Sequence, residues 1–125
     1  MKFSVDKKEK FCLFKLNDEK LITLNAPKLK TEFVILNAGG VKNIILDLED
    51  VSFVDSSGLS AILIGNRLCK NAEGSFVLTG LNDYVEKLIK ISQLDSILAI
   101  LPTVQEGIDF VNMEELERET KGSDE

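Results

Sequence analysis

The run VKNIILDL, residues 41–48, constrains the fold more than any other part of the sequence. It is apolar almost throughout and rich in β-branched residues, which indicates a central strand buried on both faces. Strands of this kind occur in parallel sheets, because helices on both sides of the sheet exclude water from it. The chain is therefore expected to be an α/β protein.

The segments around this strand alternate between strand and helix patterns. Strands are expected at FSV near Met1 and at FCLFKL, SFVLTG and SILAIL. Helices are expected from Asn25 or Ala26 to the Gly39–Gly40 pair, over Ser56–Asn71, from the Asn82 cap, and from a capping box at Thr103. The stretch 17–27 has mixed signals and is expected to be a loop. This order predicts a largely parallel sheet covered by about four helices.

The length of 125 residues predicts one domain. We place this domain at residues 1–112 and expect a charged C-terminal tail at 113–125, partly helical and then frayed. No apolar run approaches the roughly 20 residues that a membrane-spanning helix needs. The charged, alternating N-terminus does not resemble a signal peptide, so the expected location is the cytoplasm.

Charge and residue types exclude several classes of function. The net charge of −6 argues against nucleic acid and against an anionic membrane surface as partners. The chain has no histidine, which excludes a Ser-His-Asp triad and zinc ligation by histidine. The two cysteines are isolated and do not form a metal-binding pattern. We therefore expect no enzymatic activity and no cofactor.

The run VDSSGLSAIL, residues 54–63, places a small hydroxyl cluster between a strand and a helix. It lacks the glycines of a nucleophile elbow and the lysine of a P-loop. Asp55 or Ser56 could act simply as the cap of the following helix. Alternatively, a serine here could accept a phosphoryl group, which would add a charge of roughly −1.5 to −2 at the start of that helix.

A projection of the following helix, at about 100° per residue, separates two arcs. The predicted core arc contains Ile64 and the apolar or small residues near it. The opposite arc is polar but includes Leu59 and Leu63, and together these residues resemble a small docking face. Ser56 projects onto this polar arc and Ser57 onto the core side, so Ser56 is the better placed switch. The polar arc also contains Ser60, Asn66, Arg67 and Lys70.

The stretch NIILDLEDVSFVDSSGLSAILIGNRL, residues 43–68, resembles the signature of STAS domains and is most similar to bacterial anti-sigma factor antagonists. This resemblance implies a single STAS-like domain with a mixed β-sheet packed against helices. It also implies a protein partner, an anti-sigma factor that is a serine kinase, and a phosphatase that reverses the modification. The phosphoacceptor of the family maps onto Ser56. The partner-binding residues expected from the motif and the helix face are Asp55, Ser56, Ser57, Gly58, Leu59, Ser60, Leu63 and Arg67.

One position departs from the family pattern. Many relatives have a glycine-x-leucine-aspartate run before an alanine-proline helix start, and here the aspartate position is Ile22 and the glycine position is Glu19. This departure favours an alternative, a STAS binding or scaffold subunit of a signalling or lipid-transport assembly that is not phosphorylated. A third hypothesis, a nucleotide-binding enzyme, lacks any supporting motif.

Overall fold

The computed structural model describes residues 1–123. Its elements are β1 (Phe3–Lys7), β2 (Cys12–Leu16), β3 (Lys20–Leu21), α1 (Ala26–Ala38), β4 (Ile44–Asp47), β5 (Phe53–Val54), α2 (Ser56–Asn71), β6 (Phe76–Thr79), α3 (Asp83–Ile91), the 3-10 helix η1 (Leu94–Ser96), β7 (Ala99–Leu101) and α4 (Val104–Ser123).

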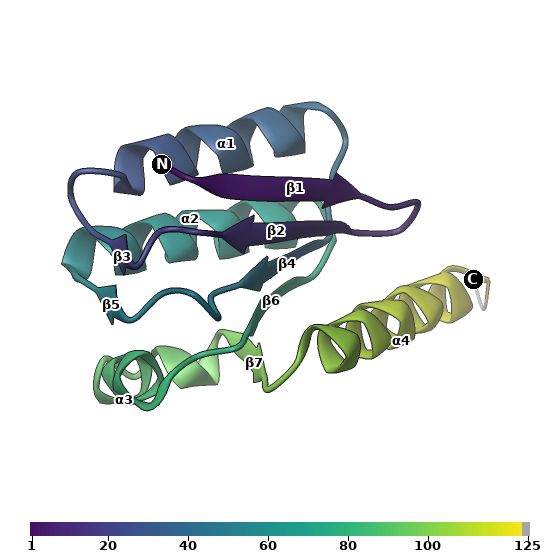
Figure 1. The fold of residues 1–125 in the computed structure, drawn as a ribbon. Helices are drawn as coiled ribbons and strands as arrows, with labels where there is room; N and C mark the ends of the chain where they lie inside the picture. Colours follow the sequence, from purple (N-terminus) through teal and green to yellow (C-terminus); the bar gives the residue numbers. More distant parts are fainter. Residues whose placement is uncertain (124–125) are drawn as a thin grey trace.

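The main sheet has five strands in the order β1-β2-β4-β6-β7 (Figure 1). β1 pairs with β2 in the antiparallel sense, and every other pair in this sheet is parallel. Ile44 of the central strand aligns with Cys12 on one side and with Phe76 on the other. The predicted mixed α/β architecture is therefore confirmed.

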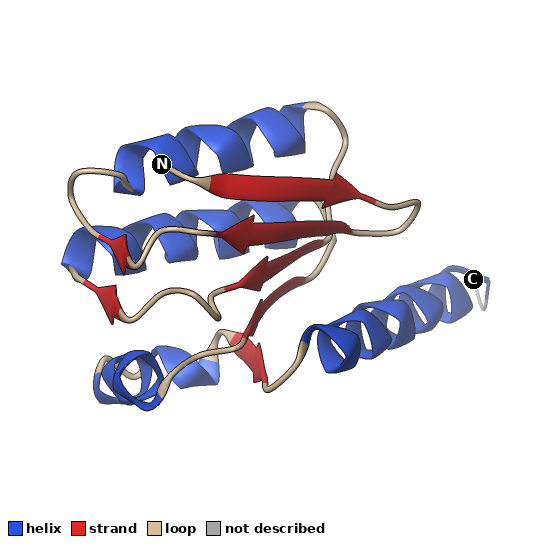
Figure 2. Cartoon of the chain, viewed as in Figure 1, coloured by secondary structure: helices blue, strands red, loops and turns tan. Residues whose placement is uncertain are grey.

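Helices lie on both faces of the main sheet (Figure 2), and side chains of its central strands alternate between two apolar clusters. Ile44 and Leu46 belong to the larger cluster, which includes residues of α1, α2 and α3. Ile45 points to the opposite face, where it packs with Val111 of α4. Burial on both faces explains why this strand is apolar throughout, as its sequence predicted.

Helices α1 and α2 pack closely against the sheet around Phe33. The Phe33 ring lies edge-on to Phe76 of β6, with ring centroids 5.8 Å apart, and to Phe14 of β2 at 5.5 Å. Gly65 of α2 lies against these rings. A Cβ at this position would be 2.6 Å from Phe76 Cε1 and 2.8 Å from Phe33 Cε2, so only glycine allows this approach.

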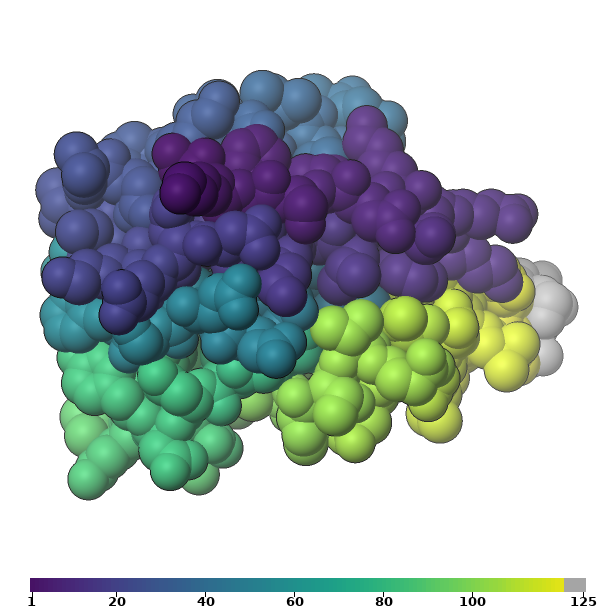
Figure 3. All heavy atoms as spheres, in the orientation of Figure 1, coloured from purple at the N-terminus to yellow at the C-terminus, as the bar shows by residue number. Residues whose placement is uncertain are grey.

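Helix α4 covers the other face and reaches back beside the β1–β2 hairpin (Figure 3). It runs without a break through position 112 as far as Ser123. The fraying expected at the end of the tail concerns 124–125, which lie outside the described residues.

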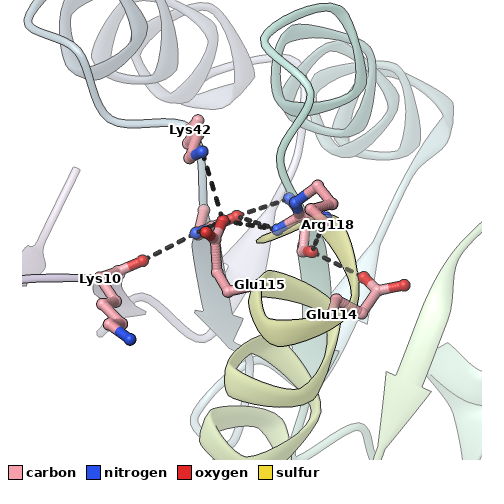
Figure 4. Close-up of polar contacts among 7 residues, drawn as sticks. Lys10, Lys42, Glu114, Glu115 and Arg118 are labelled. Carbon is pink, nitrogen blue, oxygen red and sulfur yellow. Dashed lines mark hydrogen bonds and ion pairs between the residues drawn. The ribbon is translucent and has the colours of Figure 1, made fainter. Parts of the chain in front are cut away.

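A buried polar network fixes the C-terminal half of α4 to the amino ends of β4 and β6 (Figure 4). Asn43 donates to Glu115 Oε1 at 2.9 Å and to the Lys10 carbonyl at 2.8 Å. Arg118 donates to the same glutamate oxygen at 2.6 Å, and Lys42 Nζ lies 3.5 Å from it. Burial raises the pKa of Glu115, but these hydrogen bonds and charges outweigh it and lower the value to about 2.

Candidate functional site

The site is built where the short strand β5 turns into α2. Asp55 is the N-cap of the helix, with an extended backbone (φ −97°, ψ −174°), and its Oδ1 accepts a hydrogen bond from the Gly58 amide at 2.9 Å. This confirms the capping interpretation for Asp55 and leaves Ser56 as the first helical residue.

Thr23, in the loop after β3, donates hydrogen bonds to the other carboxylate oxygen of Asp55. Its amide and its hydroxyl donate to Oδ2 at 3.0 and 3.1 Å. The hydrogen bond from Gly58, together with those from Thr23, outweighs desolvation and lowers the pKa of Asp55 below its ordinary value. Asp55 is therefore a fixed negative charge at neutral pH, with both oxygens engaged.

The two serines of the motif differ in their surroundings. Ser57 is half-buried, and its Oγ lies 3.0 Å from the Thr23 Oγ1, so the two hydroxyls share a hydrogen bond. Ser56 is exposed, and its hydroxyl makes no hydrogen bond to the residues that the structure describes. The projection had placed Ser56 outward and Ser57 inward, in agreement with these exposures. Of the two serines, Ser56 is therefore the more exposed.

Gly58 is required by the close approach of β3. It is buried, and a Cβ at this position would overlap the Leu21 carbonyl oxygen and lie 2.8 Å from Val54 Cγ1. The Asp55 amide donates to the same Leu21 carbonyl at 3.2 Å. The glycine of the motif therefore allows β3 and α2 to meet, which brings Thr23 to Asp55.

The outer face of α2 differs in part from the predicted projection. Ser56 and Arg67 are exposed, as predicted. Leu59 and Leu63 are only half-exposed and pack against the larger apolar cluster. The placement of Ile64 in the core was wrong, because its side chain is half-exposed and belongs to neither apolar cluster. The buried face of α2 is formed by Gly58, Ala61, Ile62, Gly65 and Cys69, so Ile64 lies at the edge of this face. Ser60, also on the predicted face, is half-buried.

Three further exposed side chains near the motif were not predicted from the sequence. Leu24 follows Thr23 and is 89% exposed. Phe53, just before the motif, stacks on Tyr84 of α3 with ring centroids 5.5 Å apart, and both rings remain partly exposed. The pairing of β3 with β5 brings Leu24 near the motif, and the contact of α3 with β5 brings Tyr84 there. Strands of two residues have no periodicity that a sequence could display.

The position of Ile22 is now clear. Its amide donates to the Asn25 side chain at 2.8 Å, and its side chain is half-buried in a hollow that Met1 and Lys28 also line. The residue after it, Thr23, supplies the polar contact to Asp55 instead. Neither a carboxylate nor a second charge therefore lies at the Ile22 position.

The described residues offer no group of three or more cysteine, aspartate or glutamate side chains that could hold a metal ion. Cys12 and Cys69 are buried and free, and burial raises the pKa of Cys69 to about 12. Among residues 1–123, no helix is long and apolar enough to cross a membrane.

Comparisons with known proteins agree with this geometry. The STAS domain profile matches residues 2–107. A Thermotoga neapolitana protein assigned as an anti-sigma factor antagonist is 33% identical over 72 residues, 58% of this chain and 64% of that protein. The match thus spans less than two thirds of that relative's length.

Solved structures share the fold over most of the chain. The crystal structure of a Thermotoga maritima protein, also assigned as an anti-sigma factor antagonist, has a TM-score of 0.79 and 28% identity, covering 88% of this chain and 94% of that chain. The unphosphorylated anti-sigma factor antagonist SpoIIAA, a Bacillus cell fate determinant, has a TM-score of 0.70 and 21% identity, covering 89% and 98%. The chain belongs to the STAS domain family and is similar within it to anti-sigma factor antagonists.

Proposed function

We propose that this chain is an anti-sigma factor antagonist, a binding protein and not an enzyme. In this proposal it binds an anti-sigma factor with serine kinase activity in the cytoplasm and is switched off by phosphorylation of Ser56. The observation that carries the proposal is the contrast within the motif. The hydroxyls of Ser57 and Thr23 are engaged, while that of Ser56 is exposed and makes no hydrogen bond within residues 1–123.

The partner would dock over the start of α2 and its outer face. Ser56 and Arg67 are exposed there, Leu59, Ser60 and Leu63 are half-exposed, and Leu24 extends the surface beside the motif. A contact of this kind excludes water from the Ser56 hydroxyl. Binding would release the sigma factor that the anti-sigma factor otherwise holds.

Phosphorylation would transfer the γ-phosphoryl group of ATP to Ser56 Oγ, while the hydroxyl proton passes to a base of the kinase and ADP leaves. The product carries roughly −1.5 to −2 charges beside the fixed charge of Asp55. Within the chain, the amides at the start of α2 tolerate this charge. A docked partner would have to desolvate it, so the complex would dissociate. A phosphatase would hydrolyse the ester and restore the serine.

Binding measurements with point variants test this proposal. The partner would first be isolated with the wild-type chain from native cells and confirmed to phosphorylate a serine. We expect Ser56→Asp to weaken its binding at least about tenfold, because a charge enters a desolvated contact. Ser56→Ala should bind like the wild type, and Ser92→Asp, at an exposed site at the end of α3, is the matched control. Equal binding by Ser56→Asp would refute the switch.

Ile22 favours a second candidate function, a constitutive STAS scaffold. The position where many relatives have a carboxylate holds an apolar, half-buried side chain that directly precedes Thr23 in the chain. A stable complex from native cells that never carries phosphate, with Ser56→Asp binding unchanged, would support this candidate. Efficient phosphorylation of Ser56 by the bound partner would exclude it.

A further inference from the structure

A groove runs between the C-terminal half of α2 and the segment that follows η1. It has a volume of about 530 Å³ and is lined by Leu63, Asn66, Arg67, Lys70 and Ile97. Ile97 is 53% exposed, although the next residue, Leu98, is buried. The groove therefore presents two aliphatic side chains, Leu63 and Ile97, on opposite walls.

The rim of this groove is positively charged on an acidic protein. Arg67 and Lys70 are one helical turn apart and both exposed. Neither forms an ion pair with the described residues, although acidic residues outnumber basic ones by 21 to 15 in the chain. Among the residues that the structure describes, none that lines the groove is acidic. Two neighbouring positive charges on a helix repel each other, so a carboxylate bound between Arg67 and Lys70 would be favourable.

We propose that this groove docks a segment of a protein partner that presents aliphatic or aromatic side chains flanked by carboxylates. Leu63 and Ile97 would cover the apolar side chains, and Arg67 and Lys70 would pair with the carboxylates. Nucleic acid and anionic membranes are poor alternatives, because two cations do not offset the repulsion from a net charge of −6. A protein segment needs only local complementarity.

The proposal rests on the proposed function, because it names the kind of partner segment that α2 would recognise. It adds a contact that is separate from the switch. Ser56 and Arg67 are eleven positions apart on one helix, which is about 16 Å along the axis. This exceeds the Debye length of roughly 8 Å at physiological salt, so a phosphate on Ser56 acts only weakly on the groove.

A selection experiment with the full chain tests the groove. Helix-forming peptides displayed on phage are selected against the wild type, and the most enriched one is synthesised for calorimetry. We expect apolar residues interspersed with aspartate or glutamate. Arg67→Glu with Lys70→Glu should weaken binding at least about tenfold at about 50 mM NaCl and clearly less at about 500 mM. Lys2→Glu with Lys87→Glu, the same charge change at exposed sites elsewhere, should have no effect.

The variant Ser56→Asp shows whether a charge at the switch affects binding in the groove. We expect its affinity for the peptide to be within about twofold of the wild type. The groove proposal is overturned if the enriched peptides lack carboxylates or if the double reversal, folded by circular dichroism, binds equally well. It is also overturned if Ser56→Asp abolishes peptide binding. The other possible occupant of the groove is a second copy of the chain, which sedimentation tests. Self-association of the wild type that Arg67→Glu with Lys70→Glu abolishes would assign the groove to that second copy and overturn the proposal.

Discussion

Thr23 donates two hydrogen bonds to one oxygen of Asp55, from its amide at 3.0 Å and from its hydroxyl at 3.1 Å, although the two residues are 32 positions apart. The other Asp55 oxygen caps α2 through Gly58. A single carboxylate therefore joins the loop after β3 to the start of α2. The same threonine engages the Ser57 hydroxyl and leaves the neighbouring serine free.

The substitution Thr23→Val tests this link, because it removes the hydroxyl and keeps the backbone amide. We expect the Ser57 hydroxyl to be released and the amide resonances of Ser57 and Gly58 to shift in NMR spectra. The free energy of unfolding in urea should fall by about 0.5–1.5 kcal/mol. Thr31→Val, which removes one exposed hydroxyl contact in α1, is the control and should leave those resonances unchanged. An unchanged Gly58 amide in Thr23→Val would contradict the link.

Packing predicts that an alanine substitution lowers stability at one glycine and leaves it nearly unchanged at another. Gly65→Ala should lower the free energy of unfolding by about 1–3 kcal/mol, because the new methyl group would press into the Phe33 and Phe76 rings. Gly39→Ala, at the end of α1, meets only ordinary contacts at 3.5 Å and should change stability by less than about 0.5 kcal/mol. Urea denaturation of the two variants measures this difference. Equal stability of Gly65→Ala and the wild type would show that α2 packs less closely than described.

The buried network at α4 predicts an acid-sensitive step in stability. The pKa of Glu115 is lowered from 4.5 to about 2 in the folded chain, so the unfolded chain binds more protons between these values. The resulting stabilisation is present above about pH 4.5 and is lost as the pH falls towards 2. It amounts to about 3 kcal/mol at most. Urea denaturation across this range measures it.

Glu115→Gln isolates this contribution. We expect it to be less stable than the wild type at pH 7, with a smaller loss of stability on acidification. Glu117→Gln, at an exposed position of the same helix, should retain the acid sensitivity of the wild type. Identical pH profiles for Glu115→Gln and the wild type would rule out the network as the cause.

The corrected orientation of α2 predicts which substitutions unfold the chain. Ile62→Asp should abolish folding, because Ile62 is fully buried and the charge would have no partner. Ile64→Asp should fold, because its side chain reaches solvent, and Leu63→Asp should fold with reduced stability because Leu63 contacts the core. Circular dichroism and thermal unfolding compare the three. An unfolded Ile64→Asp would restore the original projection.

Much of the fold could be predicted because apolar runs and helix-capping residues are visible in short stretches of sequence. The apolar run at residues 41–48 identified the central strand, observed as Ile44–Asp47. Asp55, Asn82 and Thr103 identified helix starts, and each accepts a hydrogen bond from an amide three residues on. The Ile64 error arose because the apolar arc of α2 is wider than the face that the fold buries, which contains Ala61, Ile62, Gly65 and Cys69.

The site could be predicted only in part, because its contacts join distant segments. The position of Ser56 on the helix predicted its exposure, which the structure shows, while its role as phosphoacceptor stays a prediction. The role of Thr23 depends on the pairing of β3 with β5, in which Leu21 lies opposite Val54. These strands have only two residues each, so the sequence shows no pattern that predicts them. The network around Glu115 likewise depends on α4 returning to Asn43, which local composition does not encode.

The central claim is that Ser56, and not Ser57, is the switch. Intact mass and peptide mapping of the chain purified from its native cells test it most directly, with Ser56→Ala and Ser57→Ala expressed in parallel. We predict one phosphate on the peptide containing Ser56, absent from Ser56→Ala and retained in Ser57→Ala. A phosphate on Ser57, or no phosphate under any growth condition, would contradict the account.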